Sequence, residues 1–228
     1  MGSQSDGADS KAYEVAPREH WPEMQALILV VSDEKKTTAS TAGMQLTVET
    51  SPLLQHRLTQ VPTYMARITE AIKQRDFAAF AEATMRDSNQ FHAVCLDTFP
   101  PIFYLSDVSR AIVHVVSELN RAAGRPVAAY TFDAGPNAVL YALEGDMPEI
   151  VSLMAHYFSP ALEFDDPFKL AAKPAASARD GFKHGISTVW EQGKVARFIH
   201  TRIGDGPRVL GADESLLTAE GLPKTLKQ

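Results

Sequence analysis

The alternation of apolar and polar stretches along the chain predicts several short strands interleaved with longer helices. Met24 to Val31 is an almost continuous apolar run, as expected of a strand buried on both faces. Ser32 to Gly43 is polar and rich in hydroxyl groups, which predicts a loop directly after that strand. Val127 to Phe132 and Ala138 to Leu143 are short apolar runs that predict two strands joined by a turn, and Val195 to Ile203 predicts a last strand.

Two long segments between these runs predict helices. Ser51 can cap a helix in which Pro52 takes the first position, since proline is tolerated there. Asp76 to Leu96 carries apolar residues near helical spacing and predicts a second helical region, one that an interruption could divide. Asp97 to Pro101 breaks that region, because consecutive prolines lack amide donors and push the preceding residues out of helical geometry.

Two further helices are predicted by the residues at their ends. Ser106 or Asp107 can start one of them, and Gly124 is placed to end it. Asp146 with Glu149 three residues later fits a capping box for a helix that runs to about residue 157. Strands mixed with helices, without an internal repeat, predict an α+β sandwich.

The remaining segments suggest how the domain is bounded. Residues 159–182 are rich in Pro, Ala, Asp and Lys with little periodicity, which predicts a surface loop or crossover. Residues 1–16 are small and polar and predict a loose lead-in. We therefore expect one domain over residues 17–203, followed by a tail over residues 204–228.

Composition narrows the class of protein. The chain has 228 residues, of which 45% are hydrophobic and 22% charged, as in ordinary globular domains. A net charge of -6 without a long basic cluster argues against nucleic acid as a partner. Cys95 is the single cysteine and suits a reducing compartment, where a buried structural thiol is expected. An apolar segment of about 20 residues, as needed to span a membrane, is absent from the sequence, and so is a signal-peptide core. We therefore expect a cytoplasmic protein without a membrane partner.

Asp133 is the most informative candidate for chemistry. It lies at the end of the run Val127 to Phe132, within a turn that also contains Gly135, Pro136 and Asn137. Two flanking strands would hold such a carboxylate rigidly at the edge of a site. Spacing alone favours a simpler role, in which Asp133 caps the turn through its own backbone.

Four blocks of sequence favour the functional role. They are Tyr130 to Asn137, Asp87 to His92, Cys95 to Pro101, and Lys35-Lys36 followed by Ser40 to Met44. In content and in their order along the chain, these blocks closely resemble the eukaryotic diphosphomevalonate decarboxylase family, and the resemblance runs along nearly the whole chain. It covers only the C-terminal part of that family, because the opening Met1 to Gly7 resembles sequence from the middle of the enzyme.

The resemblance implies a fold and a reaction. The fold is the ferredoxin-like α/β sandwich found as the C-terminal domain in the superfamily of galactokinase, homoserine kinase, mevalonate kinase and phosphomevalonate kinase. The reaction is the ATP-dependent decarboxylation of (R)-5-diphosphomevalonate to isopentenyl diphosphate in isoprenoid and sterol biosynthesis, with Mg²⁺ accompanying ATP. The resemblance further implies a homodimer.

Individual roles follow from the same resemblance. Asp133 matches the catalytic aspartate, which faces the 3-hydroxyl of the substrate. Ser40 and Met44 match the family's Ser-x-x-x-Met pattern, as a hydroxyl donor to the substrate and an apolar wall, and Thr41 is a weaker candidate for substrate contact. Lys35 and Lys36 have no assigned role, since both can also point to solvent.

Other polar residues carry no predicted chemistry. The block Asp87 to His92 predicts a structural network within a helix, with His92 as a satisfied structural histidine. The histidines show no compact spacing with Cys or carboxylates, so no protein-bound metal is predicted.

The family's phosphate loop for ATP, and its Lys, Tyr and Arg contacts to the substrate, have no counterpart in the chain. We therefore expect no nucleotide-binding residues here, and an inactive fragment of the decarboxylase. Two alternatives stay open: a non-catalytic dimerisation module derived from this enzyme, and a related phosphomevalonate decarboxylase.

Overall fold

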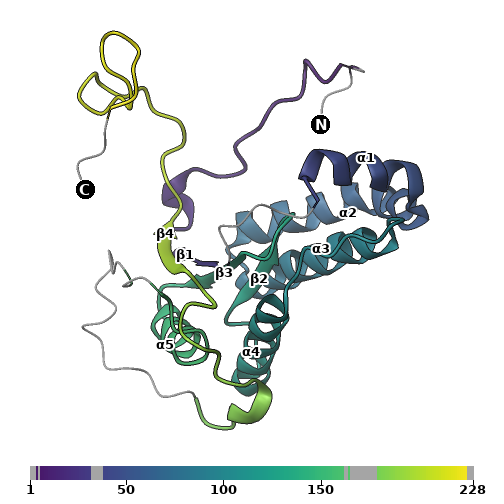
Figure 1. Ribbon diagram of the computed structural model, residues 1–228. Coiled ribbons are helices and arrows are strands. Elements are labelled where there is room, and N and C mark those ends of the chain that lie inside the picture. Colours follow the sequence, from purple (N-terminus) through teal and green to yellow (C-terminus); the bar gives the residue numbers. More distant parts are fainter. Residues whose placement is uncertain (1–3, 5, 32–37, 162–163, 165–178, 225–228) are drawn as a thin grey trace.

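The computed structural model describes residues 4, 6–31, 38–161, 164 and 179–224, and it is built around one four-stranded antiparallel sheet (Figure 1). The strands are β1 (Met24–Val30), β2 (Ala129–Phe132), β3 (Ala138–Leu143) and β4 (Arg197–Arg202). The helices are α1 (Ser40–Thr50), α2 (Pro52–Gln74), α3 (Phe77–Asp97), α4 (Asp107–Ala123) and α5 (Met147–Tyr157), with short 3-10 turns at Arg18–His20 and His184–Ile186.

The order of strands in the sheet is β2-β3-β1-β4, so the first strand in sequence lies at the centre, between β3 and β4. Leu27 of β1 is paired with Leu140 of β3 on one side and with His200 of β4 on the other. Helices α1 to α4 connect β1 to β2, and α5 connects β3 to β4. This is the ferredoxin-like arrangement, so the predicted fold class is confirmed.

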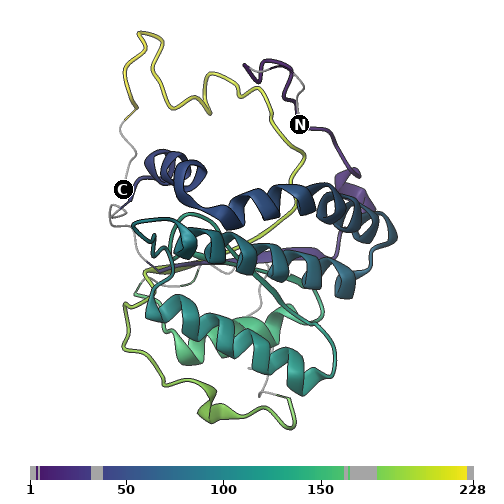
Figure 2. The same cartoon turned by 90° about the vertical axis from the view of Figure 1, so that its right-hand side faces the viewer.

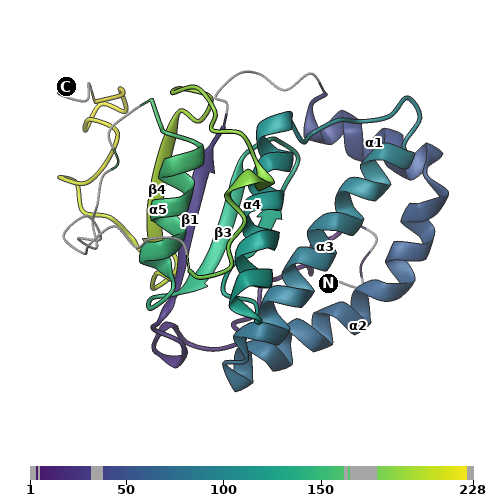
Figure 3. The same ribbon diagram turned by 90° about the horizontal axis from the view of Figure 1, so that it is seen from below.

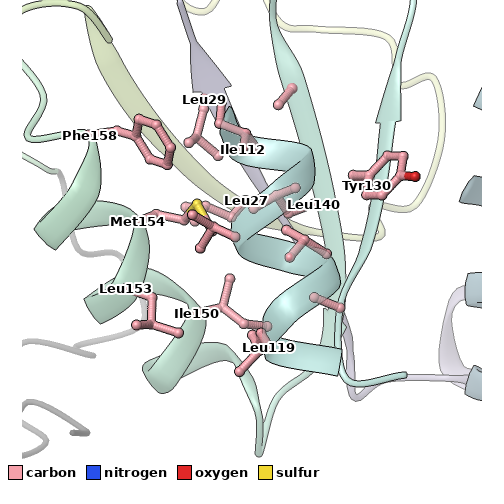
Figure 4. Packing of buried hydrophobic residues seen from close by; sticks show 14 of the residues in the cluster. Leu27, Leu29, Ile112, Leu119, Tyr130, Leu140, Ile150, Leu153, Met154 and Phe158 are labelled. Atoms are coloured by element: carbon pink, nitrogen blue, oxygen red, sulfur yellow. The ribbon is translucent and has the colours of Figure 1, made fainter. Parts of the chain in front are cut away.

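One face of the sheet carries the main core. Figure 3 shows α4 and α5 lying across this face, and Figure 4 shows the side chains that fill the space between them and the strands. Leu27 and Leu140 project from the sheet, Ile112 from α4 and Met154 from α5, and all four are fully buried. Burial of these apolar side chains removes a large hydrophobic surface from water and is the main stabilisation of the domain.

Helix α3 lies along β2, which is an edge strand, and Figure 2 shows α3 running beside α2. The hydroxyl of Ser88 accepts a hydrogen bond of 3.1 Å from the backbone N–H of Phe132, and the hydroxyl of Tyr130 donates one of 3.1 Å to Asn89. These bonds satisfy polar groups of an edge strand that would otherwise be unpaired. They confirm that the block Asp87 to His92 forms a structural network.

The predicted helix ends are confirmed at four positions. The side chains of Ser51, Asp76 and Ser106 accept hydrogen bonds from the first turns of α2, α3 and α4. Gly124 ends α4 in the left-handed conformation, with φ of 65°. Each of these ends depends on a hydrogen bond or a backbone preference of neighbouring residues, so it can be predicted from the sequence alone.

Three expectations are corrected. Ser40 to Gly43 is the first turn of α1 and not part of a loop, and α3 runs from Phe77 to Asp97 without interruption. Asp146 makes no capping hydrogen bond to α5, because its carboxylate binds Arg125 and Arg179. Glu149 also binds Arg179, so tertiary ion pairs replace the predicted capping box.

Some expectations reach beyond the described residues. Most of the loop predicted at residues 159–182 lies outside them. The domain boundaries predicted near residues 17 and 203 stay predictions. Within the described part of the chain, no helix combines the length and the apolar character needed to cross a membrane.

Candidate active site

The turn that carries Asp133 is anchored to the sheet and to α4. It follows β2 directly and leads into β3. Within the turn, the N–H of Gly135 donates to the carbonyl of Asp133 at 2.7 Å. The hydroxyl of Ser109 on α4 donates to the carbonyl of Pro136 at 2.7 Å, and the side chain of Asn137 accepts from the N–H of Val31, just after β1, at 2.8 Å. The position of Asp133 is therefore set by the sheet and by α4.

The carboxylate of Asp133 is not used to cap this turn. The turn is closed by the backbone carbonyl of Asp133 and by the side chain of Asn137. Among the described residues, no hydrogen-bond donor contacts the Asp133 carboxylate, and the residue is exposed. The turn cap expected from spacing is thus made by the backbone carbonyl of Asp133, whereas its carboxylate takes no part in it and is available to a ligand.

Asp133 borders a cavity of about 540 Å³ that lies between α1, α2, α3 and the turn. We call it the Asp133 cavity; its lining includes Ser40, Met44, Arg57, Cys95, Tyr104 and Asp133. Apolar side chains such as Leu54 and Ile102 form much of the remaining wall. A mainly apolar cavity with a few convergent polar groups is the usual form of a small-molecule site.

The cavity brings together three of the four predicted site residues. Ser40 begins α1, and Met44 follows one turn later on the same side of the helix, so both line the cavity with Asp133. Thr41 is exposed on the same turn and is not among the lining residues. Its predicted contact with substrate stays a prediction, as do the roles of the other three.

Arg57 was not identified from the sequence. Among the described residues that line the Asp133 cavity it is the single cation. Its guanidinium binds Asp87 at 2.7 Å and Gln90 at 3.1 Å, both on α3. Arg57 falls between Leu54 and Val61 on the apolar side of α2, and a lone cation within an apolar stripe is the signal that could have found it.

Two buried groups near Asp133 have shifted pKa values. Burial raises the pKa of the Cys95 thiol, and the nearby charge of Arg57 acts in the opposite direction. Cys95 is thus the buried thiol that was predicted. Burial lowers the pKa of His92, whereas a hydrogen bond to the backbone of Phe132 and the charge of Asp133 raise it. Among the described residues its Nε2 has no hydrogen-bond partner, so the prediction of a satisfied histidine is wrong.

The roles of Lys35 and Lys36 stay open, because both residues lie outside the described residues. No group of three or more His, Cys, Asp or Glu side chains within the described ranges is arranged to hold a metal ion.

A second cavity of about 390 Å³ also borders Arg57, and we call it the α2–α3 groove. Its lining includes Arg57, Tyr64, Thr84 and Tyr141.

The strand order defines a ferredoxin-like α+β domain, and Asp133 and Ser40 line the cavity at the end of β2. The family model described as "Mevalonate 5-diphosphate decarboxylase C-terminal domain" matches residues 26–210. The chain therefore belongs to the mevalonate 5-diphosphate decarboxylase family.

Individual relatives agree with this family. A diphosphomevalonate decarboxylase from Ganoderma lucidum is 58% identical over 98% of this chain, which spans 58% of that protein. The solved mevalonate diphosphate decarboxylase from Trypanosoma brucei has a TM-score of 0.84 and 34% identity, over 94% of this chain and 58% of its own. A structure of MDDEF in complex with MVAPP, AMPPCP and magnesium has a TM-score of 0.57 and 31% identity, over 63% of this chain and 44% of its own. This chain thus spans little more than half the length of the curated relative.

Proposed function

We propose that this chain provides the C-terminal part of an ATP-dependent diphosphomevalonate decarboxylase, in which Asp133, Ser40 and Met44 contact the substrate. The observation that carries the proposal is the Asp133 cavity, whose lining includes both Ser40 and the uncapped Asp133 in a chain of this family. The cavity combines polar groups that can orient a hydroxy acid with an apolar wall suited to its carbon skeleton.

Asp133 accepts the hydrogen bond of the 3-hydroxyl and takes its proton as the oxygen attacks the terminal phosphorus of ATP. ADP leaves, and the hydroxyl has become a phosphate ester. Phosphate then departs with the electrons of the C–O bond, carbon dioxide is lost from the neighbouring carboxylate, and the electrons of that C–C bond form the double bond of isopentenyl diphosphate. A fixed carboxylate supports the first step by aligning the hydroxyl for attack.

ATP with Mg²⁺ is a co-substrate in this proposal, as suggested by the AMPPCP and magnesium of the MDDEF structure. Two anionic substrates need several positive groups around them, because phosphoryl transfer depends on electrostatic stabilisation. The described lining of the Asp133 cavity offers Arg57 alone, and Arg57 is already paired with Asp87. We therefore propose that the rest of the site comes from a region that the longer relatives contain, and that this chain is inactive by itself.

A fusion tests the proposal. The part of the Ganoderma lucidum relative that this chain does not match is joined to the chain, and release of carbon dioxide is measured with diphosphomevalonate, ATP and Mg²⁺. We expect turnover by the fusion and none by the chain alone. Turnover by the isolated chain would contradict the proposed division of the site.

Variants of the fusion test the role of Asp133. Asp133→Asn keeps the size of the side chain but cannot take the proton, so kcat should fall by about 10²-fold or more. Asp107→Asn is the matched control, because Asp107 is exposed and forms an ion pair with Arg110 on α4. Equal activity of both variants would show that Asp133 takes no part in the reaction.

The substrate and the assembly are separate proposals. Comparing diphosphomevalonate with phosphomevalonate in the fusion distinguishes the two decarboxylases, and we propose the diphosphate as the preferred substrate. We also propose that the whole protein is a cytoplasmic homodimer. Light scattering of the purified fusion gives its molecular mass directly, and a monomeric mass would contradict the dimer.

A further inference from the structure

Tyr104 is a polar residue of the Asp133 cavity that the proposed reaction does not use. The residue is only 9% exposed, yet it lines the cavity beside Asp133. Within the described part of the chain, its hydroxyl has no hydrogen-bond partner. The hydroxyl oxygen is not among the fully buried unpaired atoms of the described residues, so it is accessible from the cavity. An accessible phenol hydroxyl held at a cavity wall is a group that a bound ligand can use as a hydrogen-bond partner.

The ring of Tyr104 is held firmly in place. It is stacked on Phe91 of α3, with ring centroids 6.5 Å apart and an interplanar angle of 14°. It belongs to a small buried cluster with Cys95 and Ile102, and Ala134, the neighbour of Asp133, packs against that cluster. The N–H of Ile102 donates to the carbonyl of Cys95 at 3.0 Å, which ties the segment that carries Tyr104 to the end of α3.

Helix α1 passes directly over the hydroxyl. A Cβ atom placed on Gly43 would lie 2.6 Å from the Tyr104 oxygen, a distance too short for any side chain. Gly43 is therefore the residue that lets the helix approach. Ser40 lies one turn earlier on α1 and lines the same cavity. The Tyr104 hydroxyl thus sits between the turn of α1 that carries Ser40 and the turn that carries Asp133.

The chemistry of a phenol complements that of a carboxylate. Burial raises the pKa of Tyr104, and the charges of Cys95 and Asp133 raise it further. The phenol therefore keeps its proton at neutral pH and can donate a hydrogen bond, whereas the carboxylate of Asp133 can only accept one. A hydroxy acid bound at Asp133 has a carboxylate close to its hydroxyl, and that carboxylate is the group that requires a donor.

We propose that Tyr104 is a substrate-binding residue, whose hydroxyl donates a hydrogen bond to the carboxylate of the hydroxy acid bound at Asp133. This inference rests on the proposed function. The bond is made to the carboxylate that later leaves as carbon dioxide, so it stabilises the bound substrate and not the product. Its loss should raise KM much more than it lowers kcat.

The test compares two tyrosine variants in the fusion that contains the complete chain. Tyr104→Phe removes only the unpartnered hydroxyl and keeps the stacked ring. We expect KM for diphosphomevalonate to rise roughly 10-fold, as for the loss of a hydrogen bond to a charged group, with kcat changed by less than about 3-fold. Tyr130→Phe is the control, because its hydroxyl binds Asn89 away from the cavity, and its KM should stay unchanged.

A second ligand separates this inference from the function on which it rests. Isopentenyl diphosphate has no carboxylate, so Tyr104→Phe should leave its inhibition constant unchanged.

A variant of Gly43 gives an independent check. Gly43→Ala should raise KM like Tyr104→Phe, because the new Cβ displaces the hydroxyl. If the fusion is active and Tyr104→Phe has the KM of the unmodified fusion, the inference alone is overturned. If the fusion neither binds nor converts diphosphomevalonate, both proposals fall.

Discussion

Arg57 on α2 and Asp87 on α3 form an ion pair of 2.7 Å at the wall between the Asp133 cavity and the α2–α3 groove. The side chain of Arg57 is 17% exposed, whereas that of Asp87 is 50% exposed. Gln90 accepts a second hydrogen bond from Arg57 and donates to the hydroxyl of Tyr64. The pair therefore joins two helices and keeps a positive charge at the wall of the Asp133 cavity.

Replacing Arg57 by Met should affect both binding and stability. The variant keeps a long apolar side chain but removes the charge, so KM of the fusion for its anionic substrate should rise by about 5-fold or more. The free energy of unfolding of the chain should fall by about 1 kcal/mol, because the link to α3 is lost. Urea unfolding and steady-state kinetics measure the two effects.

Arg86→Met is the matched control for Arg57→Met. Arg86 pairs with Glu82 on the exposed side of α3, and its side chain is 62% exposed. Both KM and stability should change little, because exposed ion pairs contribute little. An identical KM for the two variants would show that Arg57 does not act on the substrate.

Glu118 should make the stability of the chain depend on acid pH. Its hydrogen bond with Arg121 lowers its pKa from 4.5 to about 2, opposed by burial and aided by the N–H of Lys183. Because the folded pKa lies below the unfolded one, the stabilisation is complete above about pH 4.5 and is lost as the pH falls toward 2. In Glu118→Gln this dependence should disappear.

Urea unfolding of both proteins at pH 7, 4.5 and 3 measures this effect. The difference in unfolding free energy between the unmodified chain and Glu118→Gln should be largest at pH 7 and shrink at pH 3. Glu82→Gln serves as the control, because Glu82 is exposed and forms an exposed ion pair with Arg86. A difference that stays constant between pH 7 and pH 3 would contradict the assignment to Glu118.

Ser51→Ala should destabilise the start of α2. The hydroxyl of Ser51 accepts the N–H of Leu54 at 3.3 Å and donates to Asp97 at the end of α3 at 2.7 Å. Loss of such a cap costs about 0.5 to 2 kcal/mol of unfolding free energy. Ser117→Ala on the exposed face of α4 is the control and should be close to neutral, so equal losses would refute the capping role.

Leu140→Ala should be the most damaging of these changes. Leu140 is fully buried in the middle of β3, between β1 and β2, and packs into the main core. The cavity that it leaves should cost about 2 to 5 kcal/mol. Thermal unfolding measures the loss, and Leu96→Ala, at an exposed site of α3, should change the midpoint by much less.

Much of the fold could be predicted from the sequence, because its signals are local. The strands around Asp133 follow from apolar runs, and the starts of α2, α3 and α4 follow from Ser51, Asp76 and Ser106. A capping residue acts on amides only two or three positions away, so its effect does not depend on the rest of the chain.

Helix α1 shows where local signals fail. Its sequence is rich in Ser, Thr and Gly, and only Gly43 and Thr47 are buried in it. Thr47 shares a hydrogen bond of 2.8 Å with Thr98, and Gly43 faces Tyr104. These contacts with the end of α3 and the following segment support a helix that its own apolar spacing does not predict.

The candidate site was predicted only in part for the same reason. Asp133, Ser40 and Met44 were found through motifs, but their shared cavity is a property of the packed helices. Arg57 and Tyr104 carry no motif, and the ion pair with Asp87 and the contact with Gly43 are made by residues distant in sequence.

The sequence by itself determined the family, the order of the strands and of the helices other than α1, and the turn that holds Asp133, because motifs, apolar runs and caps act over short distances. Only the tertiary structure decided that the Asp133 carboxylate is free of its own turn, that Ser40 begins a helix, and that Arg57 and Tyr104 join them at one cavity. These outcomes depend on contacts between side chains that are distant in sequence. Such contacts form only when the helices pack against one another and against the sheet.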